Sequence, residues 1–137
     1  MDMTKLVKDY FGAFNRKDDK AWLELFADEG SLGGPAHYPP VVGKAALREL
    51  FGNIVGLFDE LNFEISAIHV QGPFAVALFT LSSRAKNGHT AMTPGMVAFA
   101  ANAEGKFFQV AGFWDPMPVL AGAMAAGSSD GRHFAAQ

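Results

Sequence analysis

Two residues combine a group suited to proton transfer with a place in the chain where a binding cavity could form. Tyr10 lies in an amphipathic segment, and its hydroxyl can donate a hydrogen bond into such a cavity. His37 lies in a proline-rich loop, and its imidazole can act as acid or base near neutral pH. Each also has a purely structural explanation. Tyr10 is equally explained as a core residue whose hydroxyl meets a backbone carbonyl, and His37 with Tyr38 as an exposed loop pair.

The other histidines and the glycine pair carry weaker signals. His69 falls on one face of an expected strand, either as a pocket imidazole or as a polar residue near the strand end. His89 follows the turn sequence Asn87-Gly88, which favours a solvated hairpin residue. The four histidines have no spacing typical of a metal site, so we expect no metal. Gly33-Gly34 is not a phosphate-binding loop, because no Lys-Ser or Lys-Thr follows it.

Three helices are expected to position these groups. The first presents an apolar face at helical spacing, formed by Leu6, Val7, Tyr10, Phe11 and Phe14. Asp18 is expected to cap the second helix, which buries Trp22 and Phe26 and ends at Gly30. A short strand at 31–34 and a loop with three prolines follow. The third helix is expected from about Lys44 to Phe58.

From residue 63 the apolar period changes from helical to two. This predicts four strands joined by short turns, and therefore antiparallel neighbours: Phe63–Val70, Phe74–Arg84, Thr90–Ala101 and Lys106–Asp115. Helices followed by strands indicate the α+β class, with three N-terminal helices packed on a curved antiparallel or mixed sheet.

The strand residues 74–81 are apolar on both alternations, whereas a sheet with one solvated face alternates apolar and polar residues. We therefore expect helices and a cavity on one face and a second copy of the chain on the other, forming a homodimer through the sheet face. The alternative is a twisted sheet whose second face is covered by the chain's own tail.

Composition excludes several classes of partner. The 137 residues are half hydrophobic, with a net charge of −3 and no basic stripe, so we expect neither nucleic-acid nor membrane binding. There is no cysteine, and no apolar run reaches the ~18 residues of a membrane span. A cytoplasmic protein is therefore expected.

Three stretches, in this order along the chain, resemble the superfamily of nuclear transport factor 2 and ketosteroid isomerase. VKDYFGAFNRKDDKAWLELFADEGSL resembles its first two helices with their "LFAD" ending, VVGKAALRELF its third helix, and EGKFFQVAGFWDP its final hairpin. The resemblance implies a cone-shaped α+β fold in one domain, residues 1–118, followed by a small-residue tail, 119–137. Residues 117–126 are expected to form a helical turn or two, and 127–137 to be weakly docked.

The resemblance also implies a set of site positions, of which this sequence keeps one. Tyr10 matches the tyrosine that stabilises an oxyanion in ketosteroid isomerases. The proton-transferring aspartate of those enzymes matches Gly34, and their protonated aspartate matches Met96 or Val97. Two of the three groups are absent, so ketosteroid isomerase chemistry is not expected.

The candidate catalytic residues are thus Tyr10 and His37. The expected ligand-binding residues are Phe14, Trp22, Phe26, Gly34, Tyr38, Phe58, Met96, Val97, Phe99, Val110 and Trp114. We expect a SnoaL-like pocket for a small hydrophobic molecule, in a cofactor-independent isomerase, cyclase or lyase (dehydratase). Two alternatives are open: a non-catalytic binder of a small ligand, and a protein-interaction module.

Overall fold

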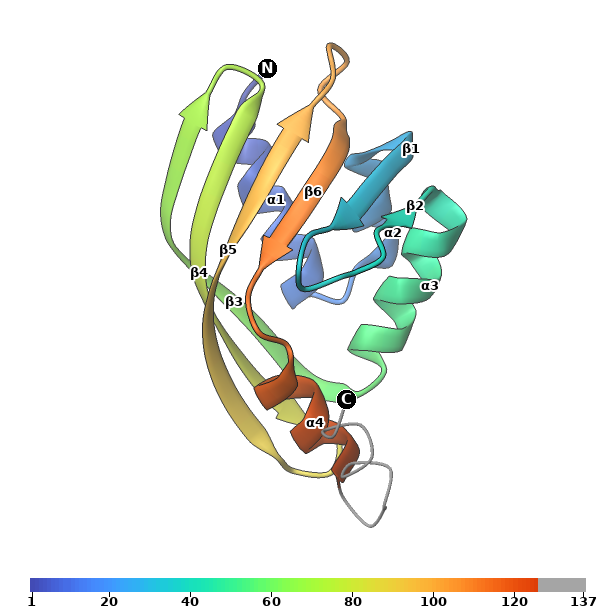
Figure 1. The fold of residues 1–137 in the computed structure, drawn as a ribbon, viewed down its shortest axis with the longest axis vertical. Helices are drawn as coiled ribbons and strands as arrows, with labels where there is room; N and C mark the ends of the chain where they lie inside the picture. Colours follow the sequence, from blue (N-terminus) through green and yellow to red (C-terminus); the bar gives the residue numbers. More distant parts are fainter. Residues whose placement is uncertain (126–137) are drawn as a thin grey trace.

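The computed structural model of the chain describes residues 1–125, in which helices pack against one face of a six-stranded sheet (Figure 1). Three helices lie in the N-terminal half and a fourth follows the last strand: α1 (Met3–Asn15), α2 (Asp19–Glu24), α3 (Lys44–Val55) and α4 (Met117–Ala125). The strands are β1 (Phe26–Gly33), β2 (Val41–Val42), β3 (Phe58–Gln71), β4 (Phe74–Ala85), β5 (Thr90–Ala101) and β6 (Phe107–Phe113). The α+β class is confirmed, but α4 adds a helix to the three expected.

The sheet is mixed, with the strand order β2-β1-β6-β5-β4-β3. β3, β4, β5 and β6 are antiparallel neighbours in sequence order, as the short turns between them predict. β1 pairs in parallel with β6 through Leu32 and Val110, which joins the N-terminal part of the chain to its last strand. The long hairpin of β3 and β4 has a register shift between Ile65 and Ala67, where one strand has an extra residue and bends.

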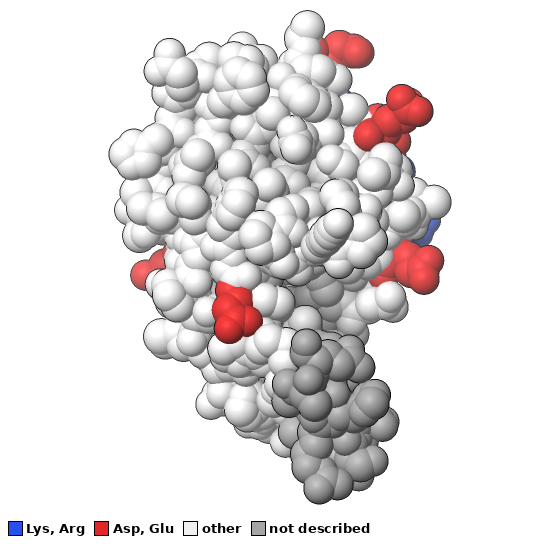
Figure 2. All heavy atoms as spheres, viewed as in Figure 1, with Lys and Arg blue, Asp and Glu red and all other residues white. Residues whose placement is uncertain are grey.

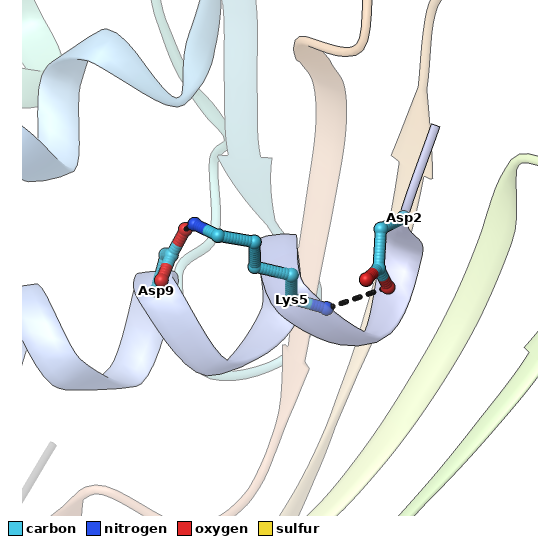
Figure 3. A network of polar contacts seen from close by, with 3 residues as sticks. All are labelled: Asp2, Lys5 and Asp9. Carbon is cyan, nitrogen blue, oxygen red and sulfur yellow. Dashed lines mark hydrogen bonds and ion pairs between the residues drawn. The ribbon is translucent and has the colours of Figure 1, made fainter.

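Helix α1 begins at a capped N-terminus and buries one face. The Asp2 side chain accepts a hydrogen bond from the Lys5 backbone N–H at 3.1 Å, and the Lys5 Nζ lies 2.7 Å from the Asp9 carboxylate (Figure 3). Asp2 thereby satisfies one of the free N–H groups of the first turn. The opposite face of the helix buries Val7, Tyr10 and Phe11, together with Met3, Ala13 and Phe14.

The connection from α1 to α2 is held against β3 by side-chain hydrogen bonds. Asn15 pairs with the backbone of Phe63 in both directions, at 2.7 Å from the N–H and 3.1 Å from the carbonyl oxygen. Lys17 has a left-handed backbone with φ of 58°, and its Nζ donates to the Phe58 carbonyl oxygen at 2.6 Å. Asp18 caps α2 as expected, accepting from the Ala21 N–H at 3.0 Å.

Two expected element boundaries are wrong. Residues 26–33 form β1, so Phe26 belongs to a strand, and Gly30 lies inside that strand instead of ending a helix. Gly30 is required by close packing, because a Cβ there would lie 2.8 Å from the Phe107 carbonyl oxygen at the irregular part of the β1–β6 pairing. The helical period also places Phe58 at the end of the third helix. That helix ends at Val55, and Phe58 begins β3 opposite Ala85.

The two faces of the sheet differ in what covers them. The inner alternation of β4, which holds Ala75, Ala77, Phe79 and Leu81, is buried in the main core beneath the helices. The outer face is apolar but open, with exposed side chains that include Phe74, Leu78, Met92, Met96, Phe108 and Phe113. Figure 2 shows few charged side chains on the side of the molecule viewed in Figure 1, most of them toward the edge of the view.

Helix α4 crosses the expected domain boundary at residue 118. Its Val119 side chain is 2% exposed and belongs to the main core, so α4 packs as part of the same unit as the sheet. The helical turns expected from residue 117 are confirmed for Met117–Ala125. The expectation of a weakly docked segment at 127–137 lies outside the described residues.

Candidate functional site

A cavity of about 140 Å³ lies between the helices and the inner face of the sheet. Its wall is formed by side chains from α1, α3, α4, β1, β3, β4 and β5, from the segments next to β1 and β6, and by the backbone of Gly112 near the end of β6. Of the described residues that line it, only Tyr10, His37 and Trp114 carry a polar side-chain atom, and none is acidic, lysine or arginine. The cavity is close in size to an engineered apolar cavity of ~150 Å³ that binds benzene.

Tyr10 stands on α1 where the cavity meets the aromatic core. The residue is 5% exposed, and its ring makes edge contacts with Phe11 and Phe99 at centroid distances of 5.2 and 5.1 Å. Burial raises the pKa of the Tyr10 hydroxyl well above its ordinary value, while the neighbouring Trp22 indole has a smaller, opposite effect. Tyr10 therefore stays protonated at physiological pH, and its hydroxyl is available as a hydrogen-bond donor.

His37 lines the same cavity from the loop between β1 and β2. The residue is half-buried, and its ring centroid lies 6.4 Å from that of Trp114 at an interplanar angle of 71°. The loop is held to the end of β6, because the Ala36 N–H donates to the Gly112 carbonyl oxygen at 3.3 Å. Burial lowers the pKa of His37, so the imidazole is neutral at pH 7 and can accept a proton.

Gly34 does not line the cavity; its missing side chain makes room for a neighbouring strand instead. Its φ is +86°, a conformation that L side chains rarely adopt, and a Cβ there would lie 2.6 Å from the Gly112 carbonyl oxygen. The close approach at this position is therefore made by the backbone of β6. A side chain cannot be added at residue 34 without displacing that strand or the loop.

Helix α4 covers part of the cavity with Val119 and Leu120. Its first turn is capped by Asp115, whose carboxylate accepts from the Met117 N–H at 3.0 Å. Its last turn is tied to the β4–β5 hairpin by the Asn87 side-chain amide, which donates to the carbonyl oxygens of Gly122 and Ala123 at 3.0 and 2.9 Å. The wall that α4 contributes thus depends on contacts with a distant hairpin.

Six of the thirteen expected site residues line this cavity, namely Tyr10, Phe14, His37, Phe58, Val97 and Trp114. Trp22, Phe26, Phe99 and Val110 are buried in the aromatic core beside it. Met96 faces outward, because adjacent residues of a strand point to opposite faces and Val97 points inward. Tyr38 is 77% exposed in its loop.

The sequence interpretation missed twelve lining residues, which are Phe11, Leu32, Ala36, Leu50, Ile54, Leu61, Phe63, Leu81, Gly112, Pro116, Val119 and Leu120. For Phe11, Leu50 and Ile54, the helical period indicated burial but not whether a core or a cavity lies opposite. For Gly112 and Ala36 the sequence pattern did not indicate a place in the cavity wall, because they line the wall through close backbone approach.

Within residues 1–125, no group of three or more His, Asp and Glu side chains is arranged to hold a metal ion. No helix in the same described range has the length and apolarity needed to cross a membrane.

Comparison with known proteins identifies this architecture. Residues 7–110 match the family model described as the SnoaL-like domain. A candidate polyketide cyclase of Xanthomonas campestris pv. campestris is 20% identical, with a TM-score of 0.77 over 88% of this chain and 95% of that chain. A Catenulispora acidiphila protein with a ketosteroid isomerase-like fold is 14% identical, with a TM-score of 0.76 over 86% and 91%.

A third similar structure is the epoxide hydrolase/cyclase-like enzyme SalBIII, described with a role in pyran ring formation in the polyether salinomycin. It is 22% identical, with a TM-score of 0.74 over 84% of this chain and 92% of that chain. At these identities the likeness shows the fold, and the expected cone-shaped fold of the nuclear transport factor 2 superfamily is confirmed.

Proposed function

Because the chain belongs to the SnoaL-like domain family, we propose that its cavity binds a small, neutral, mainly apolar molecule and acts on it without a cofactor, as an isomerase, cyclase or lyase. The observation that carries this proposal is the pairing of a neutral imidazole and a protonated phenol in an apolar cavity. His37 and Tyr10 both line the cavity, and burial moves their pKa values in opposite directions.

Neutrality of the ligand follows from the absence of charge in the wall. Burying an ionised group without a partner is strongly unfavourable, and no described lining residue is lysine, arginine, aspartate or glutamate. A carboxylate or an ammonium group would therefore lose its hydration without gaining an ion pair. At about 140 Å³, the cavity accommodates a molecule of about one ring.

The chemistry follows from His37 and Tyr10, two of the three polar side chains in the described wall. His37 is deprotonated at pH 7 and can take a proton from a bound molecule, while Tyr10 can donate a hydrogen bond to an oxygen on which negative charge develops. The similar structures support this class, because two of them are described as a candidate polyketide cyclase and an epoxide hydrolase/cyclase-like enzyme. Gly34 offers no carboxylate, which argues against ketosteroid isomerase activity.

The test is a thermal-shift and turnover screen with single-ring neutral ketones, epoxides and alcohols, alongside matching carboxylates and amines. Neutral members are expected to raise the melting temperature, and the charged members are not. For a ligand that is also converted, Tyr10→Phe and His37→Gln should each lower turnover more than tenfold. A loss of this size is expected when one general acid–base group or one hydrogen bond to a developing oxyanion is removed. Stabilisation without a product in the wild type would favour a non-catalytic binder. Stabilisation by the charged members alone would refute the neutral pocket.

We further propose that the protein is a homodimer that pairs through the outer face of the sheet. Large apolar side chains lie exposed on β4, β5 and β6, among them Phe74, Met96 and Phe113. Two copies can bring this face together without opposing like charges, because it carries few charged side chains (Figure 2). A second copy fits better than a charged partner, which would leave its own charges buried and unpaired.

Sedimentation tests the pairing directly. The wild type is expected at twice the 14.6 kDa chain mass, and Met96→Glu combined with Phe113→Glu is expected to give monomers with an unchanged fold. Lys20→Glu, on α2, is the matched control and should leave the mass unchanged. A monomeric wild type at high protein concentration would refute the dimer.

A further inference from the structure

Tyr10 is enclosed by aromatic rings, and only one of them offers a polar atom. Among the described residues, six aromatic rings lie within 6.2 Å of the Tyr10 ring, measured between centroids: those of Phe11, Phe14, Trp22, Phe26, Phe99 and Phe107. Five of these rings are hydrocarbon. The indole N–H of Trp22 is therefore the one polar side-chain group among the aromatic neighbours of the Tyr10 hydroxyl.

The Trp22 indole N–H is a buried hydrogen-bond donor without an acceptor among the described residues. Trp22 is 0% exposed, and its Nε1 has no hydrogen-bond partner among the described residues. The ring packs against Phe14, Phe26 and Phe51 at centroid distances of 5.5, 4.8 and 4.9 Å, and none of these side chains can accept a hydrogen bond. Buried polar groups without a partner are rare in folded proteins. Among the aromatic neighbours of Trp22, Tyr10 alone can supply an acceptor, at a ring-centroid distance of 5.9 Å.

The chemistry of the two groups fixes the direction of their interaction. An indole N–H can only donate, whereas a phenol oxygen can accept one hydrogen bond and donate another. We propose that Trp22 is a positioning residue: its N–H donates to the Tyr10 oxygen and directs the phenol's own proton toward a ligand in the cavity. The hydrogen bond itself is inferred from the packing of the two rings, and its effect on a ligand rests on the proposed function.

One further observation supports this arrangement. The Trp22 indole lowers the pKa of Tyr10 against the larger effect of burial, as a donor directed at the phenol oxygen does, although in this structure the Trp22 Nε1 does not meet the geometric limits of a formed hydrogen bond. Accepting a hydrogen bond also makes a hydroxyl a stronger donor, because hydrogen bonds in a chain polarise one another.

The proposal narrows the class of ligand. With its oxygen occupied by Trp22, Tyr10 interacts with the ligand only as a donor. The ligand atom that faces it must then be an acceptor, such as a carbonyl, ether or epoxide oxygen. A ligand that presents only an N–H or O–H donor at this end of the cavity would find no free acceptor on Tyr10, because the phenol oxygen already accepts from Trp22.

The first experiment detects the hydrogen bond without a ligand. The chain has two tryptophans and two tyrosines, so a ¹H–¹⁵N spectrum shows two indole signals, which Trp114→Phe assigns. In Tyr10→Phe the ring remains and only the acceptor is removed. The Trp22 indole proton should then move upfield and exchange faster with water. Tyr38→Phe removes an exposed hydroxyl and is the matched control. Equal responses of the Trp22 signal in Tyr10→Phe and Tyr38→Phe would overturn the proposal.

The second experiment measures the effect on a ligand with a matched pair of probes. Acetophenone has a carbonyl oxygen, and α-methylstyrene has the same shape with a CH₂ group in its place. Trp22→Phe is expected to weaken acetophenone binding by roughly three- to tenfold more than it weakens α-methylstyrene binding, the range of one neutral hydrogen bond. Phe26→Leu alters packing next to Tyr10 without removing a polar atom, and should affect both probes alike.

An equal loss for both probes in Trp22→Phe would mean that Trp22 acts by packing alone, and would overturn the positioning role. If neither probe binds the wild type, the proposed function fails for this ligand class. The indole signal then decides the hydrogen bond on its own.

Discussion

Gly34 is the position where a related isomerase would carry its base, and the structure predicts that no side chain can be placed there without loss of stability. Two separate effects act on Gly34→Ala. The φ of +86° strains any L residue, and the new Cβ would lie 2.6 Å from the Gly112 carbonyl oxygen. The first effect costs about 1–2 kcal/mol and the second, as overpacking, about 1–3 kcal/mol. The sum is a loss of roughly 2–5 kcal/mol in the free energy of unfolding.

Gly88 separates these two effects, because it has nearly the same φ, +88°, but a Cβ added there would have no atom within 4 Å. Gly88→Ala should therefore cost only the strain, about 1–2 kcal/mol. The assay is urea unfolding of both variants, compared through the midpoint at constant slope. Gly34→Ala is expected to lose at least ~1 kcal/mol more than Gly88→Ala, which is the lower limit of the overpacking cost.

Gly34→Asp extends the same experiment to function. It should lose at least as much stability as Gly34→Ala, and it should not gain isomerase activity on a ketosteroid. Equal losses in Gly34→Ala and Gly88→Ala would show that the loop yields without cost. It would then be wrong that the close approach of β6 keeps a carboxylate side chain out of position 34.

Three further predictions concern His37, Asn87 and Asn15. Burial holds the folded-state pKa of His37 below its ordinary 6.5, so His37 does not lower the stability of the fold above pH 6.5 but does so increasingly as the pH falls below this value. His37→Gln should therefore make the melting temperature less dependent on pH in this acidic range. Asn87→Asp keeps the oxygen that accepts from the hairpin backbone but removes the donor to α4, so hydrogen exchange in α4 should become faster. Asn102→Asp is the control, because the Asn102 side chain only accepts hydrogen bonds within its own hairpin, and it should leave exchange in α4 unchanged. Asn15→Ala removes two hydrogen bonds from the backbone of Phe63 and should lower the free energy of unfolding, measured by urea titration, by about 2–3 kcal/mol. A loss under about 0.5 kcal/mol would contradict the role given to Asn15.

Much of the fold could be predicted from local patterns. The period of two in β4 and β5 and the turn sequence Asn87-Gly88 specify strands and hairpins that the structure confirms, because these signals act between near neighbours in the chain. The error at Phe26 has the opposite origin. Its strand pairs in parallel with β6, whose residues lie far away in the sequence, and nothing local to residues 26–33 distinguishes this pairing from a helix end.

The candidate site was less predictable, although most of its expected residues are buried. Val97 and Phe99 point to the same face of β5, yet Val97 lines the cavity and Phe99 packs against Tyr10 in the core. The same holds on β6, where Gly112 lines the cavity and Val110 does not. Alternation along a strand reports the face of a side chain, but not how far along the strand the packed core gives way to a hollow.

The sequence by itself determined the buried face of α1, the turns that join the last four strands, and that Tyr10 and His37 are its candidate proton-transfer groups. Only the tertiary structure decided that these two line one cavity, that β6 fills the place of a carboxylate at Gly34, and that α4 covers part of the cavity. The physical reason is that burial periodicity is a property of one element against its surroundings, whereas a cavity is a property of several elements that fail to fill the space between them.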